Sequence, residues 1–223
     1  MRARPLLASG MARSWLGAAK GRRCPQPSGG AVKATSSSSR HHAAMPGTLY
    51  TIGHSTRAWE EFTKLLHENA IDCLVDVRRF AGSRRNPQYS PLAMGPALQG
   101  EGIEYLPMPE FGGRRKADED SRNGAWRVEA FRGYADYMAT AEFALARERL
   151  MQQASRARTS VMCAEAVWWR CHRRLISDDF TARGWNVLHI MGPGKLQQHE
   201  LNPAAVMSPS DVLVYPPAQE KLF

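Results

Sequence analysis

Residues 49–79 read LYTIGHSTRAWEEFTKLLHENAIDCLVDVRR, and this stretch decides the fold. Its first part, 49–54, is a short apolar run typical of a buried strand. Apolar residues then recur at helical spacing over 58–70, which predicts a helix with one apolar face. A second apolar run, 72–79, predicts another buried strand. Because a helix joins the two strands, we expect them to lie parallel in one sheet.

The same alternation continues along the chain to residue 191. Further strands are predicted at 103–111, 159–165 and 186–191, and further helices at 90–102, 130–157 and 171–184. In the longest helical pattern, Leu145 and Leu150 are expected to face inward, and residues 192–203 are expected to be irregular. The sequence therefore predicts one α/β domain, with a mainly parallel sheet of about five strands and helices on both faces.

The basic character of the chain is concentrated in its first part. The net charge is +9, but residues 1–44 hold eight Lys and Arg and no Asp or Glu, so the remainder is close to neutral. We interpret 1–44 as a disordered basic extension or a mis-called start; an organelle transit peptide is the alternative. Residues 45–223 form the predicted domain, with its core at about 48–205. The charge alone does not indicate a nucleic-acid partner.

Cysteine usage favours a reducing compartment. The chain has four cysteines, no secretory signal and no paired spacing, which predicts a cytoplasmic protein. It has no apolar segment long enough to span a bilayer, so no membrane association is expected. Cys24 lies in the basic extension, and Cys73 is typical of a buried core thiol.

Polar and reactive residues collect where the predicted strands end. In parallel sheets, ligands bind outside the carboxyl ends of the strands. The residues at these ends are His54, Asp76, Arg78, Glu110, Cys163, Glu165 and His189. This convergence predicts a functional cleft at that edge of the sheet.

Several motifs in order resemble a known family. They are TIGHSTR, VDVRRFAGSRRNPQYS, FGGRR, FRGYADYM and MCAEAVWWRCHRRLI. The chain resembles the bacterial family of domain of unknown function 488 over about 48–205. The resemblance implies an α/β fold and a cytosolic location, and it implies no established reaction.

Cys171 is the leading candidate for a reactive thiol. It is predicted at the start of a helix, where free backbone N–H groups, His172 and neighbouring arginines would stabilise a thiolate. Alternatively, it packs inward beside Leu175, one turn along the helix. Cys163 is interpreted as structural, with a role as resolving thiol left open.

Two further residues are candidates for acid–base roles. His54 ends a strand in a glycine turn and can titrate near neutral pH, or it can simply hydrogen-bond the turn. Glu165 is the carboxylate nearest the thiol segment, and arginines could instead pair with it. Asp76 is predicted to be structural, with an arginine or the GHST turn as its partner.

Arginines from separate segments flank the predicted cleft and suit an oxyanion, because guanidinium groups bind phosphate and carboxylate bidentately. The candidates for substrate binding are Arg57, Arg78, Arg114, Arg170, Arg173 and His172. For each one alone, a role as a solvated surface charge remains the alternative.

A metal site is not predicted, and the sequence requires no cofactor. The spacing between Cys163 and Cys171 does not match the short knuckles of zinc sites. Adjacent residues of a helix also point about 100° apart, which separates Cys171 from His172.

These observations predict an enzyme that acts on an anionic substrate, with a nucleotide or nucleic-acid component among the candidates. Cys171 would be the nucleophile or redox thiol, and His54 and Glu165 the acid–base groups. The alternatives are a non-catalytic nucleic-acid-binding module and a metal-binding protein.

Overall fold

The computed structural model describes residues 47–82 and 85–218. The predictions made for 1–44, Cys24 included, lie outside these residues. The strands are β1 (Thr48–Gly53), β2 (Cys73–Asp76), β3 (Glu104–Pro107), β4 (Thr159–Cys163), β5 (Asn186–Gly192), β6 (Lys195–Gln198), β7 (Val206–Met207) and β8 (Leu213–Val214). The helices are α1 (Trp59–Glu68), α2 (Pro91–Gly100), α3 (Glu129–Tyr137), α4 (Ala141–Arg156) and α5 (Arg173–Ala182).

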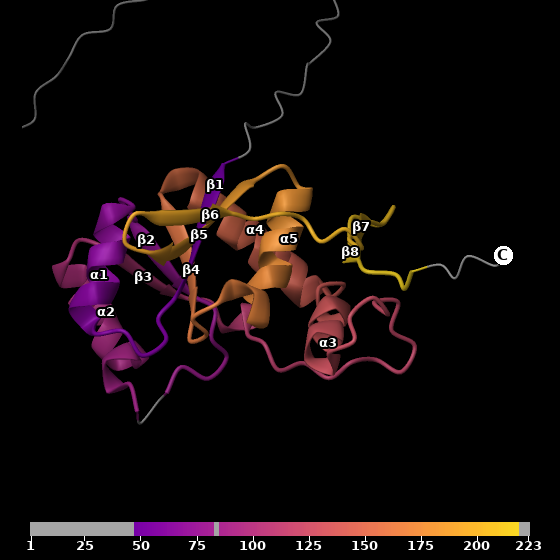
Figure 1. Cartoon of the computed structure of the whole chain (residues 1–223), viewed down its shortest axis with the longest axis horizontal. Coiled ribbons are helices and arrows are strands. Elements are labelled where there is room, and N and C mark those ends of the chain that lie inside the picture. The colour runs from indigo at the N-terminus through magenta and orange to yellow at the C-terminus, as the bar shows by residue number, and fades with distance from the viewer. Residues whose placement is uncertain (1–46, 83–84, 219–223) are drawn as a thin grey trace, which may run out of the picture. The chain divides into compact units, whose positions relative to one another are not determined.

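The described chain forms an α/β fold around one six-stranded sheet (Figure 1). The strand order is β3-β2-β4-β1-β5-β6, and the first five of these strands are parallel to their neighbours. The prediction of a mainly parallel sheet is confirmed. In this order β1 and β2 flank β4, so the segments that follow these three strands meet at one edge.

Side chains along the central strands alternate between two apolar cores, as the pleat of a strand requires. Ile52, Leu74 and Met162 pack with Phe62 and Leu65 of α1. Their strand neighbours Val75 and Val161 face the other side, where the cluster includes Tyr134 of α3, Phe143 of α4 and Leu175 of α5. Helices therefore cover both faces of the sheet, as predicted.

The long helix predicted at 130–157 is two helices, and the prediction of one continuous pattern is wrong. The first helix, α3, ends at Tyr137, and a new one begins after Thr140, whose side chain accepts a hydrogen bond from the backbone N–H of Phe143. It thereby caps α4. The break also changes the helical phase, so that Leu145 is 68% exposed while Leu150 is buried. The inward position predicted for Leu145 is wrong.

The segment after β5 is more regular than predicted. Residues Lys195–Gln198 form β6, which pairs antiparallel with β5 at the edge of the sheet. Its exposed, polar residues give no apolar signal, because the strand has a neighbour on one side only. A two-stranded pair, β7 and β8, follows. Across residues 47–82 and 85–218, none of the helices combines the length and the apolar character that crossing a bilayer needs.

Candidate functional site

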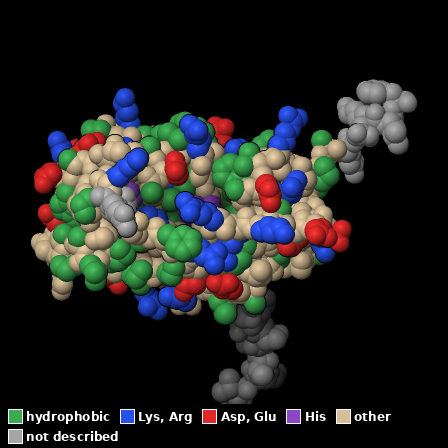
Figure 2. All heavy atoms as spheres, turned by 90° about the horizontal axis from the view of Figure 1, so that it is seen from below, with side chains coloured by type: hydrophobic (Ala, Val, Ile, Leu, Met, Phe, Trp, Pro, Cys, Tyr) green, Lys and Arg blue, Asp and Glu red, His purple; other side chains and the backbone are tan. Residues whose placement is uncertain are grey.

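A cavity of about 270 Å³ opens at the carboxyl ends of β2 and β4. Six of the predicted site residues line it: Arg78, Arg114, Glu165, Arg170, Cys171 and His172. Cys163 lines it as well. Figure 2 views the molecule from this side and shows Lys and Arg side chains gathered over the middle of the face, with histidine surface visible among them.

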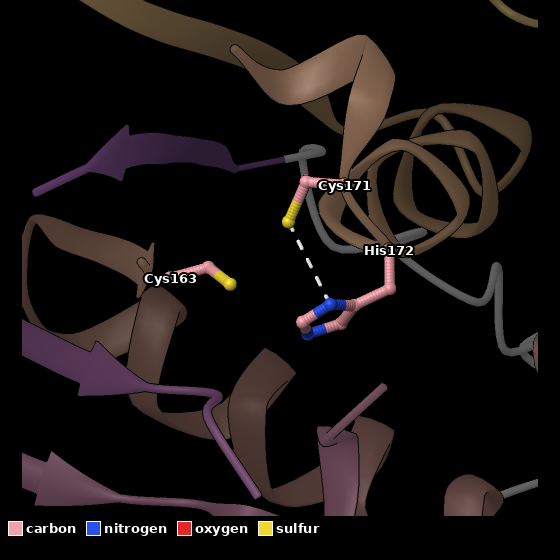
Figure 3. A group of neighbouring side chains, drawn as sticks. All are labelled: Cys163, Cys171 and His172. Atoms are coloured by element: carbon pink, nitrogen blue, oxygen red, sulfur yellow. Dashed lines mark hydrogen bonds between the residues drawn. The ribbon is translucent and has the colours of Figure 1, made fainter. Parts of the chain in front are cut away.

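Two sulfurs and one imidazole meet in this cavity (Figure 3). The ligand atoms of Cys163, Cys171 and His172 all lie within 4.8 Å of one another. A hydrogen bond of 3.6 Å joins Cys171 Sγ and His172 Nδ1. Figure 3 shows the three side chains directed toward a common centre. Cys163 is therefore part of the site, although the sequence favoured a packing role for it.

The ring of His172 is held on its other side. Its Nε2 lies 3.2 Å from the carbonyl oxygen of Val77 and donates to it, which leaves Nδ1 facing Cys171, where it accepts from the thiol when the ring is neutral and donates to the thiolate when the ring is protonated. A Cβ at Gly113 would lie 2.9 Å from Nδ1, so only glycine lets the loop approach the ring this closely. Gly113 was not singled out from the sequence.

Cys171 is not the first residue of a helix, which corrects the prediction. Its backbone is extended, with φ −128° and ψ 151°, and α5 begins two residues later at Arg173. The N–H groups of Arg174 and Leu175 bond to the carbonyls of Cys171 and His172. The first turn of α5 therefore satisfies its donors with backbone oxygens.

The two thiols have opposite pKa shifts. Burial raises the pKa of Cys171, but the hydrogen bond from Cys163, the charge and hydrogen bond of His172 and, last, the charge of Arg173 outweigh it and hold that pKa well below its usual value. Cys163 is the partner that keeps its proton. Its hydrogen bond to Cys171, together with burial, raises the Cys163 pKa well above the usual value. Cys73, by contrast, is a core thiol whose pKa burial raises to about 12.

Arg173 is buried behind the thiols, with 1% of its surface exposed. Its Nη2 donates to the carbonyl of Glu165 at 2.6 Å, and its Nη1 lies 3.5 Å from the Thr51 hydroxyl. Within the described part of the chain it forms no ion pair with a carboxylate. A buried charge is costly unless it is compensated, and the charge of Arg173 lowers the pKa of both Cys171 and Cys163.

Arg78 and His54 belong to a saturated network. Arg78 pairs with both carboxylate oxygens of Asp76, at 2.8 and 2.7 Å, and its Nη2 also donates to the carbonyl of Tyr89 at 2.8 Å. Its Nη1 lies 3.1 Å from His54 Nε2. The structural role expected for Asp76 agrees with this geometry.

Both ring nitrogens of His54 are engaged. Nδ1 lies 2.8 Å from the carbonyl of Ser55, and Nε2 accepts from Arg78. The ring also stacks on Tyr89 at 4.0 Å. Burial, the largest effect, lowers the pKa of His54 to about 4. His54 lines a second cavity of about 390 Å³ and does not line the thiol cavity. Its contact with Arg78 therefore suits a role for His54 in positioning Arg78.

Arg57 lies at neither cavity. It pairs with Glu61 at 3.2 Å and donates to the carbonyls of Gly53 and Met191. It therefore ties the turn after β1 to the end of β5, and its predicted position beside the cleft is not what the structure shows. Glu165 is exposed, and both Glu165 and Arg78 line both cavities.

The exposed arginines at the thiol cavity are Arg79, Arg114 and Arg170. In the described residues none of the three forms an ion pair. Arg79 and Arg114 lie 5.8 and 6.0 Å from the ring centre of Phe80, which is 68% exposed. Arg79 was expected beside the cleft from the sequence, whereas Phe80 was not among the sequence-derived candidates.

The remaining strand-end candidates lie elsewhere. Glu110 pairs with Arg149 at 2.7 Å and lines neither cavity. His189 lies within β5 and is buried, and its Nδ1 is 2.7 Å from the Thr51 hydroxyl. Its Nε2 is 3.0 Å from His199, which in turn bonds to Asp178. This places His189 in the core, at a distance from the carboxyl end of its strand.

The helical argument against a metal site is wrong, because Cys171 precedes the helix. Two thiols and an imidazole nitrogen are a donor set that soft divalent metals accept. The bond from His172 Nε2 to a backbone carbonyl is the kind that orients metal-binding histidines. These three residues could hold such an ion, with arginines of like charge close by.

A family model described as Domain of unknown function DUF488 matches residues 58–179. That is more than half of the chain. The chain is a member of the DUF488 family. The matched residues include Cys163, Cys171 and His172, so the thiol site lies inside the DUF488 region, while His54 precedes it. No curated protein and no solved structure matches the chain.

Proposed function

We propose that this DUF488 protein is a thiol enzyme, that Cys171 is its nucleophile, and that its substrate is anionic. The observation that carries the proposal is the buried Arg173, which lacks a carboxylate partner in the described chain and whose charge lowers the pKa of Cys171. A thiolate compensates this charge. It also faces a cavity large enough for a small reactant.

The anionic substrate follows from how the arginines are used. Arg78 is neutralised by Asp76, and Arg57 by Glu61. Arg79, Arg114 and Arg170 keep their charges exposed at the cavity, and guanidinium groups bind phosphate or carboxylate in such positions. Phe80 adds an exposed ring on which a planar base could stack, which supports a nucleotide as one candidate substrate.

His172 is the acid–base group closest to the thiol. Its Nδ1 lies 3.6 Å from Cys171 Sγ, within reach of a proton that moves between thiol and imidazole. Glu165 keeps its proposed acid–base role at the rim, where it would meet the substrate rather than the thiol. His54 acts indirectly, through Arg78.

The three described cysteines are free thiols, which supports a reducing, cytoplasmic setting for this enzyme. A thiolate nucleophile stays active there because the compartment keeps it reduced.

The test is the pH dependence of alkylation by iodoacetamide in a Cys24→Ser background, with the modified residue located by mass spectrometry. We expect Cys171 to react first, with a midpoint at least about one unit below the ~8.5 of a free cysteine. The control is Cys171→Ser, which should keep its fold and lose the fast phase. A midpoint for Cys171 at or above that of a free thiol contradicts the proposal.

A metal centre is the second candidate function, because the three donor atoms lie within 4.8 Å. Elemental analysis of the purified chain decides between the two. A stoichiometric metal that is lost in both Cys163→Ser and His172→Ala would favour the metal centre over the free thiolate.

A further inference from the structure

We infer that Cys163 is the resolving thiol of Cys171, and that the site reduces an anionic disulfide while the two cysteines become a disulfide. This inference rests on the proposed nucleophile and names its substrate class. It assigns a chemical role to Cys163, which forms the last residue of β4.

The two sulfurs are close enough for this step. They lie within 4.8 Å of each other and line the same cavity. A disulfide has its sulfurs about 2 Å apart, so they need to approach by at most about 3 Å, which side-chain rotation can supply. Figure 3 shows both sulfurs directed toward the same space beside the imidazole.

The two thiols divide the work. Cys171 attacks, because its sulfur is the one joined to His172 Nδ1, at 3.6 Å. Cys163 lines the same cavity with its sulfur within 4.8 Å, so it is the thiol placed to attack the Cys171 sulfur after the first step. The opposite pKa shifts of the two thiols agree with this order.

The chemistry balances with the disulfide R–S–S–R as the oxidant. The Cys171 thiolate attacks one sulfur, the S–S bond breaks, and R–S⁻ leaves while a mixed disulfide forms on Cys171. His172 Nδ1 gives the proton that it held against the thiolate to the leaving R–S⁻ or to water, and it then accepts the proton of the Cys163 thiol, which attacks the Cys171 sulfur. The second R–S⁻ leaves with the bonding pair. Two electrons pass from the two cysteines to the substrate.

The exposed arginines select the charge of the substrate. Arg114 and Arg170 line the thiol cavity, and an anionic R group would approach the sulfurs between them. The anionic disulfide 5,5′-dithiobis(2-nitrobenzoate) is a direct probe, because each thiolate that leaves is coloured and can be counted.

The experiment uses the reduced, metal-free full chain with Cys24→Ser. We expect two nitrothiobenzoate anions released per chain and no adduct retained. Trypsin cleaves after Arg158, Arg170 and Arg173. A digest without reductant should therefore contain peptide 159–170 disulfide-linked to peptide 171–173. In Cys163→Ser we expect one anion released and one adduct kept on Cys171, because serine can donate a hydrogen bond but cannot resolve. Cys163→Ala, checked by circular dichroism, serves if the serine variant does not fold.

The two proposals fail in different ways. If the parent chain releases one anion and keeps the adduct on Cys171, Cys163 is not a resolving thiol and the nucleophile stands. If Cys171 reacts no faster than the residual thiols of Cys171→Ser, the nucleophile itself is wrong and both proposals fall. If the chain holds one equivalent of Zn²⁺ until a chelator removes it, and the bound ion blocks both thiols, the inference is overturned in favour of a metal centre.

Discussion

Two buried arginines lie at the same edge of the sheet, and their surroundings differ. Arg78 is 7% exposed and meets both oxygens of Asp76, the carbonyl of Tyr89 and the ring of His54. Arg173 is 1% exposed, and its guanidinium contacts two backbone carbonyls and one hydroxyl. The charge of Arg78 is neutralised within the fold, whereas that of Arg173 remains available to Cys171.

The difference separates a structural arginine from a functional one. A buried ion pair with all its donors used has little left to offer a ligand. A buried cation without a carboxylate lowers the pKa of any acid beside it, and the acid beside Arg173 is a thiol.

The largest effect is expected when Arg78 loses its partner. Asp76→Asn leaves the guanidinium buried without its counter-charge and also weakens the bond from Tyr105. The free energy of unfolding should fall by about 3–5 kcal/mol, measured by urea denaturation. Arg173→Met is the matched comparison and should cost less, because it removes a charge that no carboxylate balanced. Equal losses in the two variants would erase the distinction between the arginines.

The next largest effect is expected from acid, which should lower the free energy of unfolding through His54, the neighbour of Arg78. The pKa of His54 is lowered to about 4, while its unfolded value is 6.5. The unfolded chain therefore binds a proton first as the pH falls, and the stability present above pH 6.5 is lost between 6.5 and 4. At pH 5 this loss is on the order of 1–2 kcal/mol.

The control for this prediction is His54→Gln, which can accept from Arg78 but does not titrate. Its stability should depend less on pH between 6.5 and 4. Some dependence should persist, because the pKa of His189 is lowered to about 2 by burial, the largest effect, and by the neighbouring charges of His199 and Arg173. If His54→Gln and the parent chain show the same slope, His54 is not the titrating group.

The sequence was sufficient to predict the sheet and the edge that carries the site. Apolar runs joined by helices imply parallel strands, and that places Cys171, His172 and Glu165 where β4 ends. It was not sufficient to predict the partners. Arg78 follows Asp76 by two residues, so local spacing already makes it a candidate partner, whereas the contact of Arg173 with Thr51 joins elements distant in sequence, and no local pattern records it.

Three misses have local physical causes. Thr140 could have been identified as a cap, but the helical periodicity on both sides concealed the break. Cys171 was assigned to a helix because the apolar spacing that begins at Leu175 was extended backward, whereas the extended backbone before α5 turns its sulfur toward Cys163. The buried pair of His189 and His199 was missed because residues 192–203 show no apolar pattern.

For Arg173, we expect the main effect of a substitution in the pKa of the Cys171 thiol and not in the free energy of unfolding. Arg173→Met removes a positive charge beside Cys171, and we expect its alkylation midpoint to rise by about one pH unit, equivalent to ~1.4 kcal/mol. Arg173→Lys keeps the charge and should shift the midpoint less. A midpoint unchanged in Arg173→Met would mean that Cys163 and His172 alone stabilise the thiolate.

The smallest change in the free energy of unfolding is expected at the exposed arginines, which can be compared with the buried Arg78 and Arg173. Arg114→Ala and Arg170→Ala should each alter the free energy of unfolding by less than about 0.5 kcal/mol, because neither charge is paired within the described chain. Their effect should appear in the rate with the anionic disulfide probe, which falls relative to the rate with neutral iodoacetamide. Arg57→Ala is the control, because Arg57 lines neither cavity and its loss should leave that ratio unchanged.

The ratio separates attraction of the anion from reactivity of the thiol, since both reagents meet the same sulfur. If the ratio is unchanged in Arg114→Ala and Arg170→Ala, the proposed anionic substrate is wrong and the proposed thiol nucleophile stands.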